Sequence, residues 1–281
     1  MSDYNVSKLT TIIEELDLLD HEALDDKPEP ANASSSKVKF LDTKPKVVEF
    51  LESIRDISLT STPSLYIDIE GIDLSSHGSI SILQVYVHPV GKAYLLDIHT
   101  LQEKAFLTPG SRGTTLKKVL ESNEIKKVFF DVRNDSHALF AHYGIHLAGI
   151  HDLQLIELVT RSYCKTYVTG LGKCIEHDAP ITSRERADWS LAKERGRRLF
   201  APECGGKYEV FNNRPLPQDI LQYCCQDVEF LAVLWKTYDD KMTLEKREWV
   251  VRESIERVNL SHTPSYNGNG RSKALAPLCF L

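Results

Sequence analysis

Two acidic side chains alternate with bulky apolar residues in the segment Tyr66-Ile67-Asp68-Ile69-Glu70. Such alternation is typical of a β-strand, in which residues two apart point to the same side. Asp68 and Glu70 would then leave a largely buried strand side by side, where they repel each other and are poorly solvated. A divalent cation is the most direct way to offset that cost. A half-exposed strand with two ordinary polar residues is the simpler alternative.

The segments around this strand are predicted to form a mixed sheet covered by helices. Short gaps separate the first three predicted strands, as in an antiparallel meander, whereas each of the last two is followed by a helical pattern. The predicted strands are 65–70, 80–88, 93–98, 128–132 and 150–152. The predicted helices are 45–57, 136–143, 153–163, 216–238 and 243–258. The expected fold class is therefore α/β, with a mixed five-stranded sheet flanked by helices.

Composition divides the chain of 281 residues into one folded domain and two end segments. Residues 1–37 are acidic and contain clusters of Pro and Ser, which is typical of a flexible segment that could bind a protein partner. We expect one domain over 38–260, and the Ser, Pro, Asn and Gly residues that follow predict a tail over 261–281. The net charge of -6 comes from the acidic segment, so the domain itself neither requires nor forbids a partner with phosphates.

Two further acidic positions are predicted on helices. Tyr223 and Asp227 are four residues apart on the long helix predicted over 216–238, and they therefore share one of its faces. Asp135 follows the strand predicted over 128–132, at the start of the next helix. Taken alone, each of these residues is compatible with an ordinary surface position or a helix cap. Their meaning depends on their combination with the acidic strand.

In combination, an Asp-x-Glu strand, an Asp at the start of a middle helix and a Tyr-x-x-x-Asp helix resemble the DEDDy class of 3′–5′ exonucleases. That class has an RNase H-like fold, and the resemblance is greatest to its RNase D branch, over about residues 40–240. The passages that carry it further are Ser79-Ile80-Ser81-Ile82-Leu83-Gln84-Val85, Arg214-Pro215-Leu216-Pro217 and Asp227-Val228. The resemblance therefore implies an RNase H-like fold for the domain.

The resemblance also implies the chemistry of the site. Two divalent metal ions, Mg²⁺ or Mn²⁺, would be held by four carboxylates, those of Asp68, Glu70, Asp135 and Asp227. Asp68 would bridge both ions, and Asp135 would act through water. Tyr223 would orient the attacking water, because its phenol is not expected to ionise near neutral pH. The class hydrolyses phosphodiester bonds at 3′ ends of single-stranded RNA or DNA and releases nucleoside 5′-monophosphates.

One stretch departs from the bacterial RNase D pattern. Residues 190–213 form an insertion after Asp188-Trp189, and it is similar to that of eukaryotic Egalitarian-type exonuclease-domain proteins. Some members of that group lack the carboxylates and are RNA-binding adaptors without catalysis. All four acids and the tyrosine are present here, so we expect an active enzyme on single-stranded nucleic acid, with RNA favoured over DNA. A catalytically silent adaptor is the alternative.

Four residues are weaker candidates for binding substrate, and they are Gly71, Arg195, Arg197 and Arg198. Arginines contact phosphates without reading sequence, and a glycine can let a nucleotide approach the backbone. Ordinary solvated charges and a glycine that forms a turn explain the same residues equally well.

The cysteines and the apolar segments disfavour other classes of protein. The six cysteines contain no C-x-x-C pair, so reduced thiols are expected. The less favoured alternative is a zinc site formed by Cys164, Cys174, His177 and Cys204. The sequence has no run of about 20 apolar residues and no signal peptide, so we expect a soluble intracellular protein, in cytoplasm or nucleus, without a membrane partner.

Overall fold

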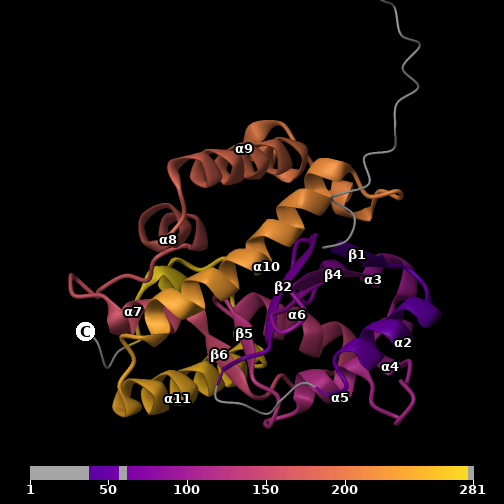
Figure 1. Ribbon diagram of the computed structural model, residues 1–281, viewed down its shortest axis with the longest axis horizontal. Helices are drawn as coiled ribbons and strands as arrows, with labels where there is room; N and C mark the ends of the chain where they lie inside the picture. Colours follow the sequence, from indigo (N-terminus) through magenta and orange to yellow (C-terminus); the bar gives the residue numbers. More distant parts are fainter. Residues whose placement is uncertain (1–37, 57–61, 278–281) are drawn as a thin grey trace, which may run out of the picture. The chain divides into compact units, whose positions relative to one another are not determined.

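A six-stranded mixed sheet lies at the centre of the computed structural model, which describes residues 38–56 and 62–277 (Figure 1). The acidic segment 1–37 lies outside the described residues, as do 57–61 and 278–281. In spatial order, the strands are β1 (Val38–Leu41), β4 (Lys92–Asp97), β3 (Ser79–Val87), β2 (Leu65–Ile72), β5 (Lys127–Phe129) and β6 (Ile150–Asp152). β2, β3 and β4 form the predicted antiparallel meander, and β5 and β6 extend it in parallel from β2.

The sheet has one strand more than the five that the sequence predicted. The additional strand, β1, pairs in parallel with β4 at the edge of the sheet. It is only four residues long and mostly half-buried, so it has too few positions for a clear pattern. Its pairing depends on a partner strand far along the chain, which local periodicity does not reveal.

Helices cover both faces of the sheet, and α10 crosses it next to β2 (Figure 1). The described α-helices are α2 (Lys44–Ser53), α3 (Ile98–Leu101), α4 (Glu103–Leu107), α5 (Leu116–Glu121), α6 (Arg133–Tyr143), α7 (Leu153–Thr160), α8 (Leu171–Asp178), α9 (Ser183–Phe200), α10 (Gln218–Asp239) and α11 (Leu244–Ser261). The 3₁₀ helices are η1 (Pro202–Cys204), η2 (Tyr208–Asn212) and η3 (Arg271–Ala274). None of the described helices has the length and apolar character needed to cross a membrane.

The alternation in β2 gives its two faces different neighbours. One face joins the core formed with α2, α5 and α6 through three buried residues, Leu65, Ile67 and Ile69. Tyr66, on the other face, belongs to the core that includes α7 and α10. Asp68 and Glu70 continue the Tyr66 face, because side chains two apart on a strand point the same way. The two acids therefore lie on the side of the sheet that α10 covers.

The segment after α11 packs on the domain, whereas the sequence predicted a tail from residue 261. The Tyr266 hydroxyl donates to Asn134 Oδ1 at 2.6 Å. The backbone N–H of Val168 donates to the carbonyl of Ala274, and that of Ala276 donates to the carbonyl of Thr166, each at 3.0 Å. Polar and small residues here pair with neighbouring loops, so a composition typical of a tail belongs to an ordered part of the domain.

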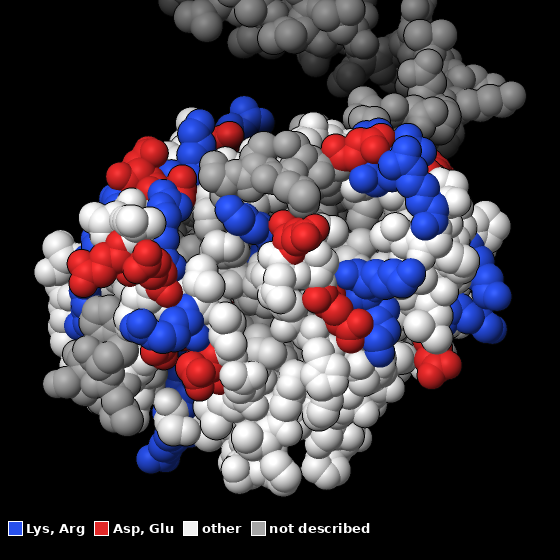
Figure 2. All heavy atoms as spheres, turned by 90° about the horizontal axis from the view of Figure 1, so that it is seen from below, with Lys and Arg blue, Asp and Glu red and all other residues white. Residues whose placement is uncertain are grey.

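The face of the molecule seen from below carries Lys and Arg close to Asp and Glu, around a broad uncharged area (Figure 2). A phosphate backbone is attracted most strongly by contiguous basic side chains. This face therefore gives no electrostatic reason to place a nucleic acid on it.

Candidate active site

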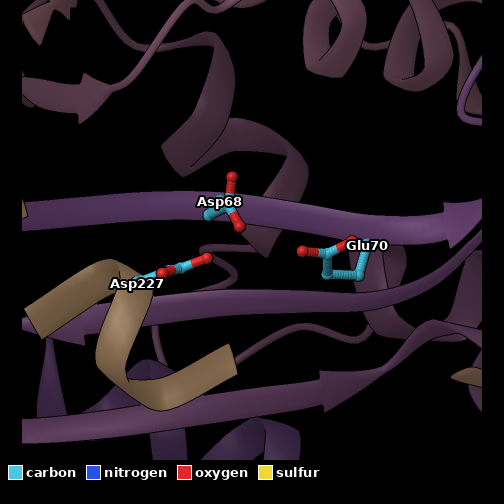
Figure 3. Close-up of side chains that lie close together, drawn as sticks. All are labelled: Asp68, Glu70 and Asp227. Carbon is cyan, nitrogen blue, oxygen red and sulfur yellow. The ribbon is translucent and has the colours of Figure 1, made fainter. Parts of the chain in front are cut away.

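Three carboxylates from β2 and α10 meet between the strand and the helix (Figure 3). One oxygen from each of Asp68, Glu70 and Asp227 lies within 4.8 Å of the other two. Asp227 is buried, and Asp68 and Glu70 are partly buried. Divalent cations such as Mg²⁺ bind oxygen ligands of this kind, so the donor set fits a hard metal ion. The structure thus brings together three of the four predicted acidic ligands.

Burial and mutual repulsion both oppose the ionised form of this cluster. Burial raises the pKa of Asp68 to about 7, and the charge of Asp227 adds to the effect. The pKa of Glu70 is also raised, first by burial and then by the charge of Asp68. A bound cation would reverse this balance, because its charge favours the carboxylate forms. The electrostatics therefore agree with the donor set in favouring a metal site.

Asp135 lies near this cluster but not among the three carboxylates that approach within 4.8 Å. It is buried in the first turn of α6, where negative side chains are favoured. Burial raises the pKa of Asp135, and the charge of Asp68 is the next largest cause. The fourth predicted acid is thus within electrostatic range of the cluster, and its action through water stays a prediction.

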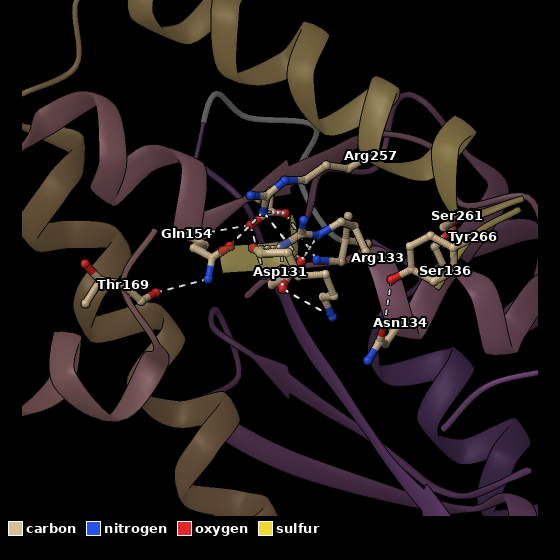
Figure 4. A network of polar contacts seen from close by, with 12 residues as sticks. Asp131, Arg133, Asn134, Ser136, Gln154, Thr169, Arg257, Ser261 and Tyr266 are labelled. Atoms are coloured by element: carbon tan, nitrogen blue, oxygen red, sulfur yellow. Dashed lines mark hydrogen bonds and ion pairs between the residues drawn. The ribbon is translucent and has the colours of Figure 1, made fainter. Parts of the chain in front are cut away.

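A buried polar network fixes the turn from β5 into α6, and so positions the helix that carries Asp135 (Figure 4). The Asp152 carboxylate accepts the backbone N–H groups of Asp131 at 2.9 Å and Val132 at 3.1 Å. It also accepts a hydrogen bond from Arg257 Nη1 at 2.7 Å. Asp131 has a φ of 59°, a left-handed conformation that Asp tolerates better than most residues. Asp152 also caps α7, because its side chain accepts the backbone N–H of Gln154.

Tyr223 reaches the cluster from α10, where its hydroxyl favours the ionised form of Glu70 and so opposes the rise in the pKa of that carboxyl. Burial raises the pKa of the Tyr223 phenol, and the charges of Asp227 and Glu70 raise it further. The hydroxyl therefore stays protonated at neutral pH and acts as a hydrogen-bond donor. This state agrees with a role in orienting a water molecule and disfavours a role as a base.

The insertion brings into the cluster a lysine that was not predicted to belong to the site. Lys193 Nζ, on α9, lies 3.1 Å from Oδ1 and 3.4 Å from Oδ2 of Asp227. It also lies 5.2 Å from the ring centroid of Tyr223 and 5.7 Å from that of Trp189. A capping box formed by Thr182 and Glu185 marks the start of α9 and was the available sequence signal for the helix.

The three arginines proposed as phosphate ligands are on the same helix but make surface contacts. Arg197 forms an ion pair with Glu203 at 3.1 Å, and Arg198 forms one with Glu194 at 3.0 Å. Arg195 is exposed. None of these ion pairs involves a carboxylate of the cluster. The contact of the three arginines with substrate therefore stays a prediction.

Gly71 has a structural explanation that does not involve substrate. It lies at a β-bulge in β2, where the pairing register with β3 shifts after Glu70. A Cβ atom at this position would lie 2.0 Å from the carbonyl oxygen of Ser79. Only glycine permits this close approach of two backbones. The bulge accounts for Gly71, and its contact with a nucleotide stays a prediction.

The four residues of the alternative zinc site do not converge. Within residues 38–56 and 62–277, the acidic cluster is the only group of three or more potential metal ligands that lie within range of one another. Cys164 and Cys204 are exposed free thiols, whereas Cys174 is buried. A carboxylate site is thus favoured over a thiolate site.

Comparison with known proteins supports this fold and identifies its family. A family model described as 3′–5′ exonuclease matches residues 40–242, so the chain belongs to this family of exonucleases. Mouse piRNA biogenesis protein EXD1 is 26% identical over 175 residues, which are 60% of this chain and 28% of that protein. The chain therefore spans less than a third of that relative's length.

Solved structures of RNase D have the same fold. Trypanosoma brucei RNase D in complex with RNA U12 is 21% identical, with a TM-score of 0.65, over 87% of this chain and 77% of that one. Escherichia coli RNase D, described as an exoribonuclease involved in structured RNA processing, is 16% identical with a TM-score of 0.56, over 81% of this chain and 51% of that one. The predicted RNase H-like fold and the resemblance to RNase D-like exonucleases are confirmed.

Replacing Arg257 by Ala would leave the Asp152 carboxylate buried without its guanidinium partner. We expect the free energy of unfolding to fall by about 3–5 kcal/mol, because an uncompensated buried charge is strongly destabilising. Urea denaturation followed by circular dichroism measures the change, with Arg252→Ala, at an exposed position of the same helix, as the control. Equal stability of the two variants would contradict the assigned role of the pair.

The raised pKa of Asp68 predicts how the metal-free protein responds to pH. Its pKa is 3.8 without perturbation and about 7 in the fold, so between these values the folded state holds a proton that the unfolded state releases. The free energy of unfolding should therefore fall as the pH rises from about 4 to about 7. Asp68→Asn removes this titration and should flatten the dependence.

Urea denaturation in EDTA at about pH 5 and about pH 8 tests this expectation. The wild-type protein should lose more stability between the two pH values than Asp68→Asn does. Asp240→Asn, at an exposed position after α10, is the matched control and should behave like the wild type. A loss in Asp68→Asn as large as that in the wild type would contradict the assignment.

Proposed function

We propose that this protein is a 3′–5′ exonuclease that uses two divalent metal ions to hydrolyse phosphodiester bonds at 3′ ends of single-stranded RNA. The products would be nucleoside 5′-monophosphates and a shortened strand. The observation that carries the proposal is the cluster of Asp68, Glu70 and Asp227 in a chain of the 3′–5′ exonuclease family.

The acidic residues would divide the metal ligands between them. Asp68, Glu70 and Asp227 would hold one ion, and Asp68 together with Asp135 would hold the second. When bound, the ions act as Lewis acids that ease the deprotonation of water and neutralise charge on the scissile phosphate. Mg²⁺ and Mn²⁺ both prefer the carboxylate oxygens that this cluster offers.

Tyr223 would orient the water that attacks phosphorus. Its protonated hydroxyl lies near enough to Glu70 to favour the ionised form of that carboxyl, so it is at the ligand cluster without adding negative charge. The water oxygen forms the new bond to phosphorus, the bond to the 3′ oxygen of the preceding nucleotide breaks, and that oxygen takes up a proton. A fixed hydrogen bond reduces the entropic cost of aligning the water opposite the leaving oxygen.

Names of related proteins support RNA as the substrate. The Trypanosoma brucei RNase D structures are described as complexes with RNA U12 and with GMP, and the mouse relative is named for piRNA biogenesis. The substrate preference of this chain and the binding of a protein partner by segment 1–37 are predictions. The preference for RNA or DNA can be measured with a nuclease assay.

The assay compares 5′-labelled single-stranded RNA and DNA of the same sequence, incubated with the purified protein in Mn²⁺ or in EDTA. We expect a ladder that shortens from the 3′ end, depends on metal and forms faster on RNA. Asp68→Asn and Asp227→Asn, which keep the size of the side chain, should each reduce the rate by about 100-fold or more. Asp240→Asn serves as the control.

Two results would contradict the proposal. Full activity in purified Asp68→Asn or Asp227→Asn would show that hydrolysis does not depend on this cluster. Binding of RNA without shortening, under every metal tested, would favour a catalytically silent adaptor with the same fold.

A further inference from the structure

The insertion helix α9 packs on α10 at a point where the two helices come unusually close. A Cβ atom on Gly196 would lie 2.8 Å from Cβ of Tyr223 and 3.0 Å from two carbon atoms of its ring. Only glycine allows this approach, so Gly196 fixes α9 against the helix that carries Tyr223 and Asp227. Lys193 lies one turn earlier on α9 and is therefore held over the same part of α10.

The ammonium of Lys193 is surrounded by groups that favour a cation. Both oxygens of Asp227 lie within 3.4 Å of Nζ. The rings of Tyr223 and Trp189 lie on other sides, at distances typical of cation–π contacts. The side chain is 23% exposed, so the pair is screened less than an ion pair on the surface.

The charge of Lys193 acts on the whole cluster and not only on Asp227. Burial is the largest cause of the raised pKa values of Asp68 and Glu70, and the charge of Lys193 opposes it at both carboxylates. The insertion thus adds a positive charge to a site that consists otherwise of acids and a tyrosine. Both oxygens of Asp227 are in contact with this charge, so a metal ion that binds Asp227 has to share them with Lys193.

We propose that Lys193 is a positioning residue, supplied by the insertion, that holds the Asp227 carboxylate beside Tyr223 and serves as the resident counter-cation of the acidic cluster. A divalent metal ion that binds Asp227 shares or displaces this contact. The inference rests on the proposed function, since it assigns metal to the same carboxylates. It gives the insertion a role in setting metal affinity and in keeping the cluster assembled before metal binds.

Two opposite effects follow for Lys193→Met, which keeps a long apolar side chain against the rings but removes the charge. Without metal, the midpoint of thermal unfolding should fall by about 3–6 °C, because the carboxylates lose their counter-cation. The affinity for Mn²⁺ should instead increase, by about 10-fold, because the competing charge is gone. A residue that only packs against α10 would not produce this combination.

The experiment uses the full chain and four forms of the protein, namely the wild type, Lys193→Met, Lys193→Arg and the control Lys207→Met, whose lysine is exposed in the same insertion. Thermal unfolding is recorded in EDTA and in saturating Mn²⁺, and Mn²⁺ is titrated by calorimetry. In Lys193→Met, the loss of thermal stability should shrink in Mn²⁺. Lys193→Arg, which keeps the charge, and Lys207→Met should both remain close to the wild type.

Several outcomes would overturn the inference. An equal loss of thermal stability in EDTA and in Mn²⁺ would mean that Lys193 only packs, and weaker Mn²⁺ binding by Lys193→Met would mean that it does not compete with metal. If Lys193→Met does not fold in EDTA, folding of Lys193→Arg supports the inference and its failure to fold overturns it.

A failure of the proposed function is recognised separately. If the wild type binds no Mn²⁺, the two-metal proposal fails. The unfolding midpoints in EDTA then still decide whether the charge of Lys193 holds the cluster together. If the wild type binds Mn²⁺ and Lys193→Met matches it in both measurements, only the inference about Lys193 fails.

Discussion

The domain has to accommodate three carboxylates in a confined space between β2 and α10. Such groups repel one another and lose solvation, and nearby positive charge is the remedy that physical chemistry offers. Strand β2 places Asp68 and Glu70 on one face, and α10 adds Asp227. Helix α9 supplies the positive charge, because Lys193 Nζ lies 3.1 Å from Oδ1 of Asp227. The same repulsion favours the binding of a divalent metal ion, so the source of instability in the fold is also the basis of the proposed catalysis.

A second set of charged residues, outside the carboxylate cluster, holds the turn from β5 into α6. The Asp152 carboxylate, at the end of β6, accepts a backbone N–H that follows β5 and forms an ion pair with Arg257 of α11. One carboxylate thus connects β6, the turn after β5, and α11. The segment after α11 joins this network, because Arg133 donates to the carbonyl of Lys273 at 2.9 Å. Since α6 begins at this turn, the position of Asp135 depends on residues from the end of the domain. The C-terminal segment is therefore part of the framework of the site.

The sequence allowed the α/β class, the meander and the acidic strand to be predicted, because these depend on local alternation and on short gaps between strands. The combination of Asp68, Glu70, Asp135, Tyr223 and Asp227 was predicted through the resemblance to a family. Lys193 could not be predicted in the same way, since its contact with Asp227 joins residues 34 apart through the packing of α9 on α10. The edge strand β1 and the packing of residues 262–277 were missed for a similar reason, because both depend on partners distant in sequence.

A crystal soaked in Mn²⁺ would show, through the anomalous scattering of the metal, whether the acids bind two metal ions. We expect two peaks, one within about 2.2 Å of oxygens from Asp68, Glu70 and Asp227, and a second between Asp68 and Asp135. A map without anomalous density at the cluster, or with density only elsewhere on the protein, would contradict this expectation.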